Sequence, residues 1–338
     1  MAHKKPNQRL TLTMLESDCN DILRSPALDT FETDLVKEQC KKMIAQLSEE
    51  ELELAAQSSY AYWKYSQSCS SPSSELRKKM AMREANRYFL AANRDQSKAL
   101  EYLRKTCTYR QETRVDILRA CFDKDFCFAN EQDRDLAATF RARILQDTAS
   151  QPIVVHGRDK ADCAILRIGE RHCSKTDDQE FLTTQLYMVE RALAATEANS
   201  MGCQDMMVVF LDAGCFQSKC APSRTILKEL ISILQNHYPQ RLKTLLVLDP
   251  PLWLRSMYAV LSPALDKRTR QKFQMAKGKK AKRRVFGEIV KEEESDMEDE
   301  LDLRQYTSEV PFHCSYDEYR QRDESFRETM HQRAILVQ

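Results

Sequence analysis

Glycine is scarce in this 338-residue chain, which contains only six. None stands in the G-x-G-x-x-G or G-x-x-x-x-G-K spacing that lets backbone amides close around a phosphate, and no G-x-S-x-G turn offers a hydrolase serine. Long apolar runs are also missing. The longest, "MMVVFL", has six residues, against roughly 20 for a bilayer span. These absences argue against a nucleotide-binding enzyme, a serine hydrolase and a membrane-spanning protein.

The twelve cysteines form no C-x-x-C pair and no Cys/His frame of a zinc site. The closest two, Cys215 and Cys220, are five positions apart and lie beside an expected strand. The start, "MAHKKPNQRL", lacks the apolar segment of a secretory signal. We therefore predict reduced thiols, no metal and no cofactor, in a cytoplasmic protein that meets membranes only peripherally.

One motif imitates a catalytic loop. His313, Cys314 and Arg320 have the spacing of a cysteine-dependent phosphatase, in which backbone amides and an arginine hold the phosphoryl group. The five residues between Cys314 and Arg320, "SYDEY", include no glycine and two carboxylates that would repel a phosphate. The remaining histidines are scattered. We predict that the chain is not an enzyme.

The first half of the chain has helical periodicity. It marks residues 8–23 and 31–57, the latter with a capping-box pattern at Ser48, and two further helices are expected within 75–110, beyond a serine-rich loop at 66–74.

From about residue 150 the pattern changes to short aliphatic runs. The expected strands are "PIVVHG" (152–157), "DCAILRI" (162–168), "MMVVFLD" (206–212) and "LLVLD" (245–249). Helices are expected between them at 177–199 and 223–238. Strands that alternate with helices of this length indicate βαβ units and a largely parallel sheet. The predicted organisation is four regions: helices and a loop (1–74), a helical lobe (75–145), a sheet lobe (146–275) and a charged tail (276–338).

Residues 252–265 form the most apolar of the expected helices. Pro251 directly precedes this segment and Pro263 lies near its end. Its apolar arc is wider than one core-facing stripe, so we expect one side to pack on the protein and the other to face a lipid. An ordinary buried core helix is the alternative.

Charge is segregated after the sheet region. The segment "AKGKKAKRR" places six basic residues in nine positions, and "KEEESDMEDELD" follows with eight acids. Most of 275–338 is expected to be loosely ordered. The basic residues are candidates for contact with an anionic membrane surface, while a solvated tail and a nuclear import signal stay open. These candidates are Lys277, Lys279, Lys280, Lys282, Arg283 and Arg284. Nucleic acid is not an expected partner, because no aromatic platform accompanies them.

Five stretches, in order, resemble the CRAL-TRIO lipid-binding family and in particular its yeast-type phosphatidylinositol-transfer proteins. They are "RYFLAANRDQSKALEYLRKTCTYRQ" (87–111), "VVHGRDKADCAILRI" (154–168), "LYMVERAL" (186–193), "VVFLDAGCF" (208–216) and the segment 236–273 that begins "NHYPQRL". The resemblance implies an α/β fold. A small α-helical N-terminal lobe precedes a largely parallel sheet lobe, and residues 252–265 form a helical gate over an apolar pocket.

The resemblance also implies site residues. The pocket and gate would include Met207, Val209, Trp253, Leu254, Met257, Tyr258, Leu261 and Leu265. Candidates for the lipid head group are Gln240, Thr269 and Lys272. Relatives that carry phosphatidylinositol have an arginine and a glutamate where this chain has Ala92 and Gln240. Met207 and Val209 replace hydroxyl side chains that meet a choline head in other relatives, which makes this pocket more apolar.

The resulting functional prediction is a lipid-binding and lipid-transfer protein that encloses one ligand, phosphatidylinositol or another phospholipid, and exchanges it at a membrane surface through the gate. The alternative is a lipid-sensing adaptor that binds a sterol-, tocopherol- or retinoid-like molecule without transferring it.

Overall fold

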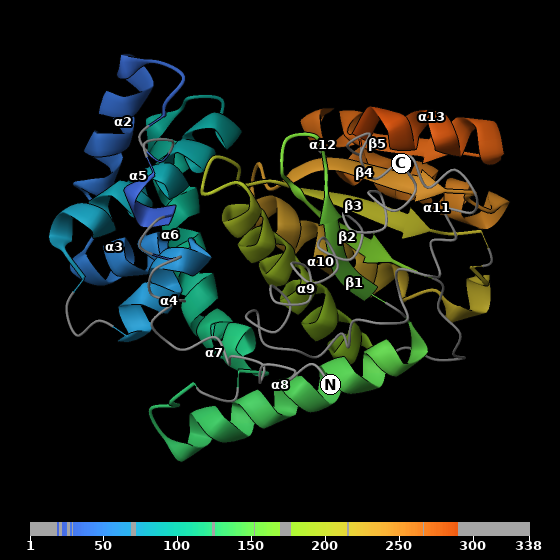
Figure 1. Cartoon of the computed structure of the whole chain (residues 1–338), viewed down its shortest axis with the longest axis horizontal. Helices are drawn as coiled ribbons and strands as arrows, with labels where there is room; N and C mark the ends of the chain where they lie inside the picture. The colour runs from blue at the N-terminus through green and yellow to red at the C-terminus, as the bar shows by residue number, and fades with distance from the viewer. Residues whose placement is uncertain are drawn as a thin grey trace, which may run out of the picture.

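Two lobes lie side by side, one helical and one built on a sheet (Figure 1). The computed structural model describes residues 30–289, apart from 69–71, 124–125, 152, 170–176, 215 and 266, together with 19, 22–25 and 28. Most of the expected helix at 8–23, part of the serine-rich loop, and the motif from His313 to Arg320 lie outside the described residues.

Seven described helices precede the first strand. They are α2 (Asp34–Ile44), α3 (Glu49–Ala56), α4 (Tyr60–Ser68), α5 (Ser74–Ala91), α6 (Gln96–Glu112), α7 (Val115–Ala120) and α8 (Glu131–Ser150). Side-chain caps fix several of their starts. Ser48 and Glu51 form the expected capping box at α3, and Ser73 and Asp95 cap α5 and α6. The two helices expected within 75–110 are thus confirmed.

The second lobe is a five-stranded sheet in the order β1-β2-β3-β4-β5. Its strands are β1 (Ile153–Arg158), β2 (Ala164–Ile168), β3 (Met207–Asp212), β4 (Leu242–Leu248) and β5 (Phe273–Ala276). Only the β1–β2 pair is antiparallel. Helices α9 (Asp178–Asn199) and α10 (Arg224–His237) connect successive parallel strands, as the alternating pattern predicts. The expected α/β class and largely parallel sheet are confirmed.

Alternation along the strands gives the sheet two apolar faces. On one face, Leu166 and Val209 pack against α9 through Met188 and Val189. On the other face, Ile165, Val208, Phe210 and Leu246 form a separate cluster.

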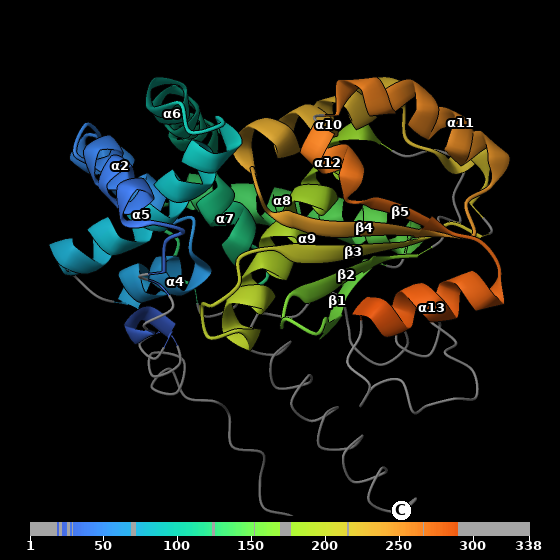
Figure 2. The same cartoon turned by 90° about the horizontal axis from the view of Figure 1, so that it is seen from above.

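Helix α13 (Lys279–Ile289) covers this second face, where Val285 is buried and Ala281 and Ile289 pack against the cluster. Figure 2 shows α13 on one side of the sheet and α10, α11 (Leu252–Leu261) and α12 (Lys267–Gln271) on the other. The start of the segment expected to be loosely ordered is therefore a strand and a helix, and the sheet lobe continues past residue 275. Residues 290–338 lie outside the described part of the chain.

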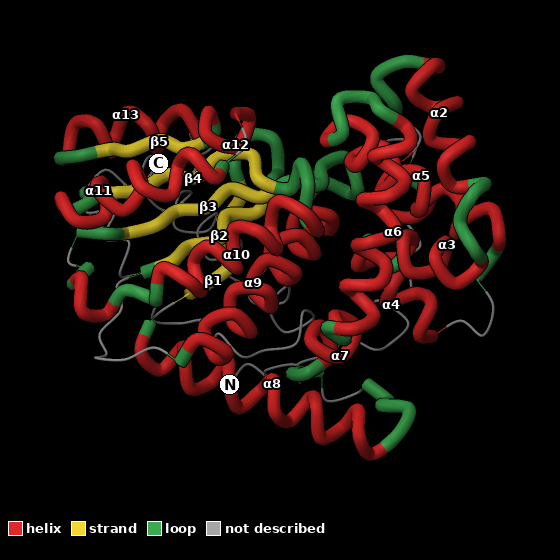
Figure 3. Tube along the Cα trace, turned by 180° about the vertical axis from the view of Figure 1, so that it is seen from behind, coloured by secondary structure: helices red, strands yellow, loops and turns green. Residues whose placement is uncertain are grey.

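The helical lobe meets the sheet lobe through α4 and α7 against α9, and through α6 against α10. Seen from behind, the strands form one continuous layer with α9 and α10 on its near side (Figure 3). Polar and charged side chains occupy much of the junction, as described below.

Candidate functional site

A cavity of about 980 Å³ lies over the first face of the sheet, at the upper end of the roughly 300–1,000 Å³ typical of ligand sites. The sheet supplies Leu166, Ile168, Met207, Val209 and Leu245 as its floor. Its other walls come from α9, α10, the gate helix α11 and the end of α5. Most of the wall is apolar, contributed by aliphatic and aromatic side chains of these elements.

Helix α11, the predicted gate, forms one side of the cavity. Trp253, Leu254 and Met257 line it, and Leu265, after the short helix η3 (Ser262–Ala264), lines it as well. The Trp253 indole N–H donates to the Phe216 carbonyl at 3.0 Å, which ties the start of the gate to the loop after β3. The structure thus brings together Met207, Val209 and these four predicted gate residues.

Two predicted gate residues do not line the cavity. Tyr258 packs its ring against Phe273, with centroids 5.0 Å apart. Leu261 is buried beneath the helix and is only 7% exposed. Both side chains hold α11 in position. They are absent from the cavity wall because they lie on sides of the helix that do not face the cavity.

The outer side of α11 exposes apolar side chains beside the polar Arg255 and Ser256. Leu252 is 77% exposed and Val260 is 60% exposed. A helix of the core would bury both, since each buried aliphatic side chain contributes about 1.5–3 kcal/mol. The alternative of an ordinary buried core helix is therefore wrong, and α11 has one cavity-facing side and one exposed side that includes Leu252 and Val260.

Polar groups gather at one end of the cavity. Gln240, Thr269 and Lys272, the three predicted head-group residues, all line it there. Gln240 precedes β4 in a left-handed conformation with φ of 60°. The Lys272 ammonium donates to the carbonyl of Leu242, which lies two residues after Gln240 in the chain. The end of the cavity where β4 and β5 begin is therefore its polar end.

Several residues at this polar end, Arg241 among them, were not predicted from the sequence. Asn93, Lys267 and Arg268 line the cavity beside Thr269. The Arg268 guanidinium donates to the Leu90 carbonyl at 2.9 Å and to Asn93 Oδ1 at 3.1 Å. For Lys267 and Arg268, the sequence offers a signal in the basic stretch "DKRTRQK" (266–272), which directly follows the expected helix at 252–265.

Arg268 lies beside Ala92, the position at which the resemblance implies an arginine in carriers of phosphatidylinositol. Ala92 caps the end of α5 and is buried, and the residues on either side of it, Ala91 and Asn93, line the cavity. Arg268 reaches this same turn from α12, on the other lobe. A cation is thus present near position 92 although the residue at that position is apolar.

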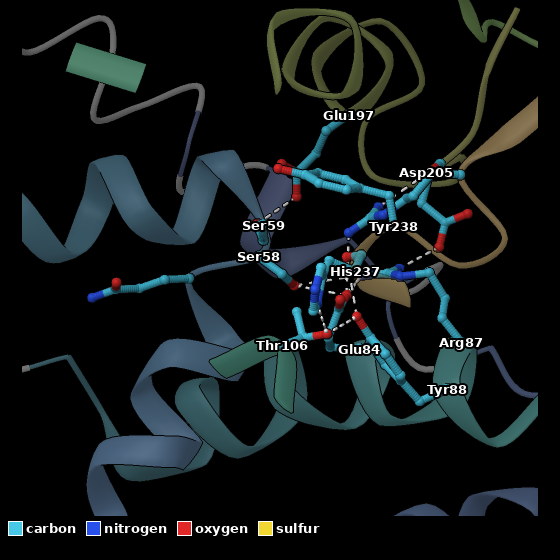
Figure 4. Close-up of polar contacts among 12 residues, drawn as sticks. Ser58, Ser59, Glu84, Arg87, Tyr88, Thr106, Glu197, Asp205, His237 and Tyr238 are labelled. Atoms are coloured by element: carbon cyan, nitrogen blue, oxygen red, sulfur yellow. Dashed lines mark hydrogen bonds and ion pairs between the residues drawn. The ribbon is translucent and has the colours of Figure 1, made fainter. Parts of the chain in front are cut away.

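A network of buried charges joins the two lobes (Figure 4). Arg87 pairs with Glu84 and with Asp205, the latter at 2.5 Å. Arg241 reaches the same Glu84 carboxylate at 3.1 Å, and Ser58 donates to it at 2.8 Å. Burial opposes ionisation of Glu84, but Arg87 and Arg241 outweigh it and lower its pKa. These contacts fix α5 against the β3 and β4 starts.

A second buried carboxylate, Glu190 of α9, is only 1% exposed. It pairs with Arg110 at 3.0 Å and with Arg119 at 2.6 Å, and the Tyr238 hydroxyl donates to it at 2.8 Å. Burial alone would raise its pKa, but the two guanidinium groups lower the pKa to about 2. Glu190 therefore stays ionised and holds α6, α7 and α10 around α9.

His237 belongs to a neutral part of this junction. Its Nδ1 lies 3.0 Å from Thr106 Oγ1, and its ring stacks on Tyr109 with centroids 3.9 Å apart. Burial, with a contribution from Arg110, lowers its pKa to about 4. The imidazole is therefore uncharged at neutral pH and takes a structural position outside the cavity wall.

The predicted membrane-surface residues lie away from the gate. Lys277, Lys279, Lys280 and Arg284 are exposed at or on α13, and Lys282 pairs with Asp249 at 2.5 Å. Of Arg283 only the backbone, within α13, is described. Helix α13 covers the face of the sheet opposite the cavity, so it and α11 lie on opposite sides of the sheet (Figure 2).

The predictions about cysteines, metals and membrane spans concern the whole chain, and the structure addresses part of it. Cys40, Cys107, Cys121 and Cys163 are buried thiols, and burial raises the pKa of Cys40 to about 12. No helix among the described residues has the length and hydropathy to cross a bilayer.

A largely parallel sheet lies under a large apolar cavity that has polar and basic groups at one end. Comparisons with known proteins indicate the class of protein that has this arrangement. Residues 148–295 match the family model of the CRAL/TRIO domain. Patellin-4 of Arabidopsis thaliana is 26% identical over 209 residues, which are 58% of this chain and 34% of that protein.

Two further proteins are similar to this chain, one in sequence over a short stretch and one in fold at low identity. Tyrosine-protein phosphatase non-receptor type 9 of Homo sapiens is 25% identical over 126 residues, 37% of this chain and 20% of that protein. The matched part of this chain thus spans about a third of the length of Patellin-4 and about a fifth of the length of the phosphatase. The crystal structure of Sfh5 matches with a TM-score of 0.55 at 15% identity, over 88% of this chain and 99% of that chain, which supports the fold.

Residues 148–295 are therefore a CRAL/TRIO domain, and proteins with this domain bind or transfer lipids, with a single lipid ligand in the domain. Proteins of this family are generally non-enzymatic lipid binders, and the match to the phosphatase covers only part of that protein.

Proposed function

We propose that the protein encloses one anionic phospholipid, with phosphatidylinositol as the first candidate, and exchanges it at a membrane surface by movement of α11. The observation that carries this proposal is the pairing of a 980 Å³ apolar cavity with Lys267, Arg268 and Lys272 at one end of its wall. Hydrocarbon chains fill the apolar part in this proposal, and the phosphate meets the cations.

The energetics favour exchange rather than permanent binding. Each buried methylene contributes about 0.8 kcal/mol relative to water, so two chains with about thirty carbons gain on the order of 24 kcal/mol. A bilayer offers nearly the same gain, and transfer between bilayer and cavity is therefore close to balance. Head-group contacts then select the lipid, and the gate sets the rate.

Arg268 supplies the phosphate contact that position 92 lacks. It approaches the same turn of α5 and lies next to Thr269 at the polar end. A guanidinium group bonds a phosphate through paired N–H donors, each charge-assisted bond contributing about 1.5–3 kcal/mol. Gln240 can donate to and accept from inositol hydroxyl groups, in place of the glutamate of relatives.

The membrane meets the protein through the exposed side of α11. Leu252 and Val260 already present apolar surface there, so contact with lipid requires no unfolding of the helix. The basic side of α13 faces elsewhere, and one flat bilayer cannot contact both. In this proposal, α13 provides at most a separate contact with anionic lipid, and its charges do not guide the gate.

Binding to defined vesicles tests the proposal. Wild-type protein should extract phosphatidylinositol from mixed vesicles in preference to phosphatidylcholine, with one lipid per chain in native mass spectra. Arg268→Gln should weaken phosphatidylinositol uptake about tenfold, whereas Arg270→Gln, exposed on the same helix and absent from the cavity wall, should not. Equal uptake by the two variants would exclude Arg268 as the phosphate contact.

A second candidate is an adaptor that senses a sterol-, tocopherol- or retinoid-like ligand without transferring it. The observation in its favour is the apolar floor at Met207 and Val209, which offers no hydroxyl group to a choline head. A transfer assay between donor and acceptor vesicles separates the two candidates, because an adaptor binds its ligand and leaves the lipid composition of the acceptor unchanged.

A further inference from the structure

A polar side chain faces the cavity far from its polar end. Gln185, on α9, is only 7% exposed and lines the cavity. Its neighbours one turn before and after, Phe181 and Val189, line the same wall and are apolar. Within the described part of the chain, the Gln185 amide has no hydrogen-bond partner, although a buried amide normally has one.

Topology places Gln185 toward the opposite end of the cavity from the head-group residues. Thr196, later on α9, bonds to Ala164 and Met206 at the starts of β2 and β3. Gln185 precedes Thr196 by three turns, about 16 Å along the helix. The Arg241 carbonyl accepts from Met207 at the β3 start, so Gln240 lies at the level of Thr196.

The wall near the end of β2 carries a second amide. Gln151 is 3% exposed, lines the cavity, and donates to the Gly169 carbonyl at 2.9 Å. Ile168 lines the same region, while Arg167 alternates to the other face of the sheet. The charged residues of the cavity wall, Arg241, Lys267, Arg268 and Lys272, belong to the start of β4, to α12 and to the residue before β5.

We infer that Gln185 forms a second polar subsite, which hydrogen-bonds an uncharged oxygen on the hydrocarbon part of the ligand. This inference rests on the proposed lipid-binding function. A hydroxyl or carbonyl group satisfies an amide, which both donates and accepts. A charged group does not suit the site, because no ionised partner lines that wall and burial of an unpaired charge is costly. The ligand class is an oxygenated lipid, polar at two separated points.

Competition between matched lipids tests the subsite. A fluorescent fatty acid bound to the full chain serves as the probe. Two matched pairs of lipids compete with it: stearic acid against 12-hydroxystearic acid, and cholesterol against 25-hydroxycholesterol. Wild-type protein should prefer the oxygenated member of at least one pair by about tenfold, the effect of one buried hydrogen bond. Gln185→Met, which nearly keeps the volume, should lose that preference while it keeps its affinity for the parent lipid.

The matched control is Gln179→Met, an exposed position on the same helix that is absent from the cavity wall. It should keep the wild-type preference. Binding of both members of each pair with equal affinity by wild type, or the same preference in Gln185→Met, would overturn the subsite and leave lipid binding intact. Failure of the wild type to bind any of these lipids, together with failure to take up phosphatidylinositol, would overturn both proposals. Gln185→Leu repeats the comparison if the methionine variant folds poorly.

Discussion

Arg268 and Asn93 join the two lobes across the polar end of the cavity, with Nη2 of the arginine 3.1 Å from Oδ1 of the asparagine. The same guanidinium group contacts the Leu90 carbonyl. Arg268 stands in the helix immediately after the gate, so displacement of α11 and α12 as a unit must break these bonds. The contact therefore links opening of the cavity to separation of the lobes at this point.

Loss of the Asn93 side chain should accelerate ligand release. Asn93→Gly removes the acceptor and suits the backbone, whose φ of 54° glycine adopts freely. Because the bond is exposed, we expect a modest effect, about a fivefold faster exchange of a fluorescent lipid measured by stopped flow. A release rate equal to that of the wild type would show that this contact does not restrain the gate.

A charge at Trp253 should abolish transfer. Trp253→Asp places a carboxylate in the apolar wall and removes the indole bond to the Phe216 carbonyl. Circular dichroism should show an intact fold, while lipid transfer between vesicles falls to background. Transfer at the wild-type rate would contradict the assignment of α11 as the gate.

The exposed side of the gate should matter for membranes and not for ligand affinity. Leu252→Asp combined with Val260→Asp should slow transfer at least tenfold, because a charged surface does not enter the bilayer interface. Equilibrium binding of a dispersed lipid should be unchanged. Leu35→Asp, on α2 and 69% exposed, is the matched control and should transfer normally. Equal slowing in the control would point to a general effect of added charge.

Removal of the Glu190 charge should destabilise the fold. Glu190→Gln leaves Arg110 and Arg119 buried without their counter-ion, at a cost of about 3–5 kcal/mol in urea unfolding. Glu112→Gln, exposed at the end of α6, should change stability by less than about 0.5 kcal/mol. The pKa of Glu190 is depressed from 4.5 to about 2, so its contribution is present above pH 4.5 and is lost as the pH falls toward 2.

His237 should make the stability of the fold depend on pH in a range above the one in which Glu190 titrates. Its pKa falls from 6.5 to about 4 in the fold, so the unfolded chain takes up a proton first as the pH drops. Stability should therefore decline by about 1–2 kcal/mol between pH 6.5 and pH 4, with allowance for solvent screening. His237→Gln should be less stable at pH 7 and should lose this slope. A slope retained in the variant would assign it to other groups.

Much of the sheet lobe could be predicted from sequence, because β2, β3 and β4 are runs of buried aliphatic residues between turn signals. Strand β5 escaped prediction. Its residues Gln274 and Met275 are exposed and only Ala276 is buried, so the segment lacks an apolar pattern. Helix α13 did carry a signal, since Ala281, Val285 and Ile289 recur every four residues, but the surrounding charge made the segment resemble a solvated tail.

The cavity wall likewise contains residues that could be predicted from the sequence and residues that could not. The position of α11 at the cavity was predictable because its apolar arc was too wide for one core-facing side. Arg268 was not, because its partner Asn93 lies 175 positions away in the chain and only the fold brings them together. Gln185 directly follows Thr183 and Thr184 on α9, and its orientation toward the cavity follows from helix packing rather than from periodicity.

Native mass spectrometry of the full chain after incubation with vesicles that contain phosphatidylinositol tests the central claim, that the cavity holds one lipid, most directly. The account predicts a single added mass of one lipid per chain, which a cavity-filling Val209→Trp variant should lose while its melting temperature changes little. A chain that stays free of lipid at every vesicle concentration, or that binds as much lipid with the cavity filled, would contradict it.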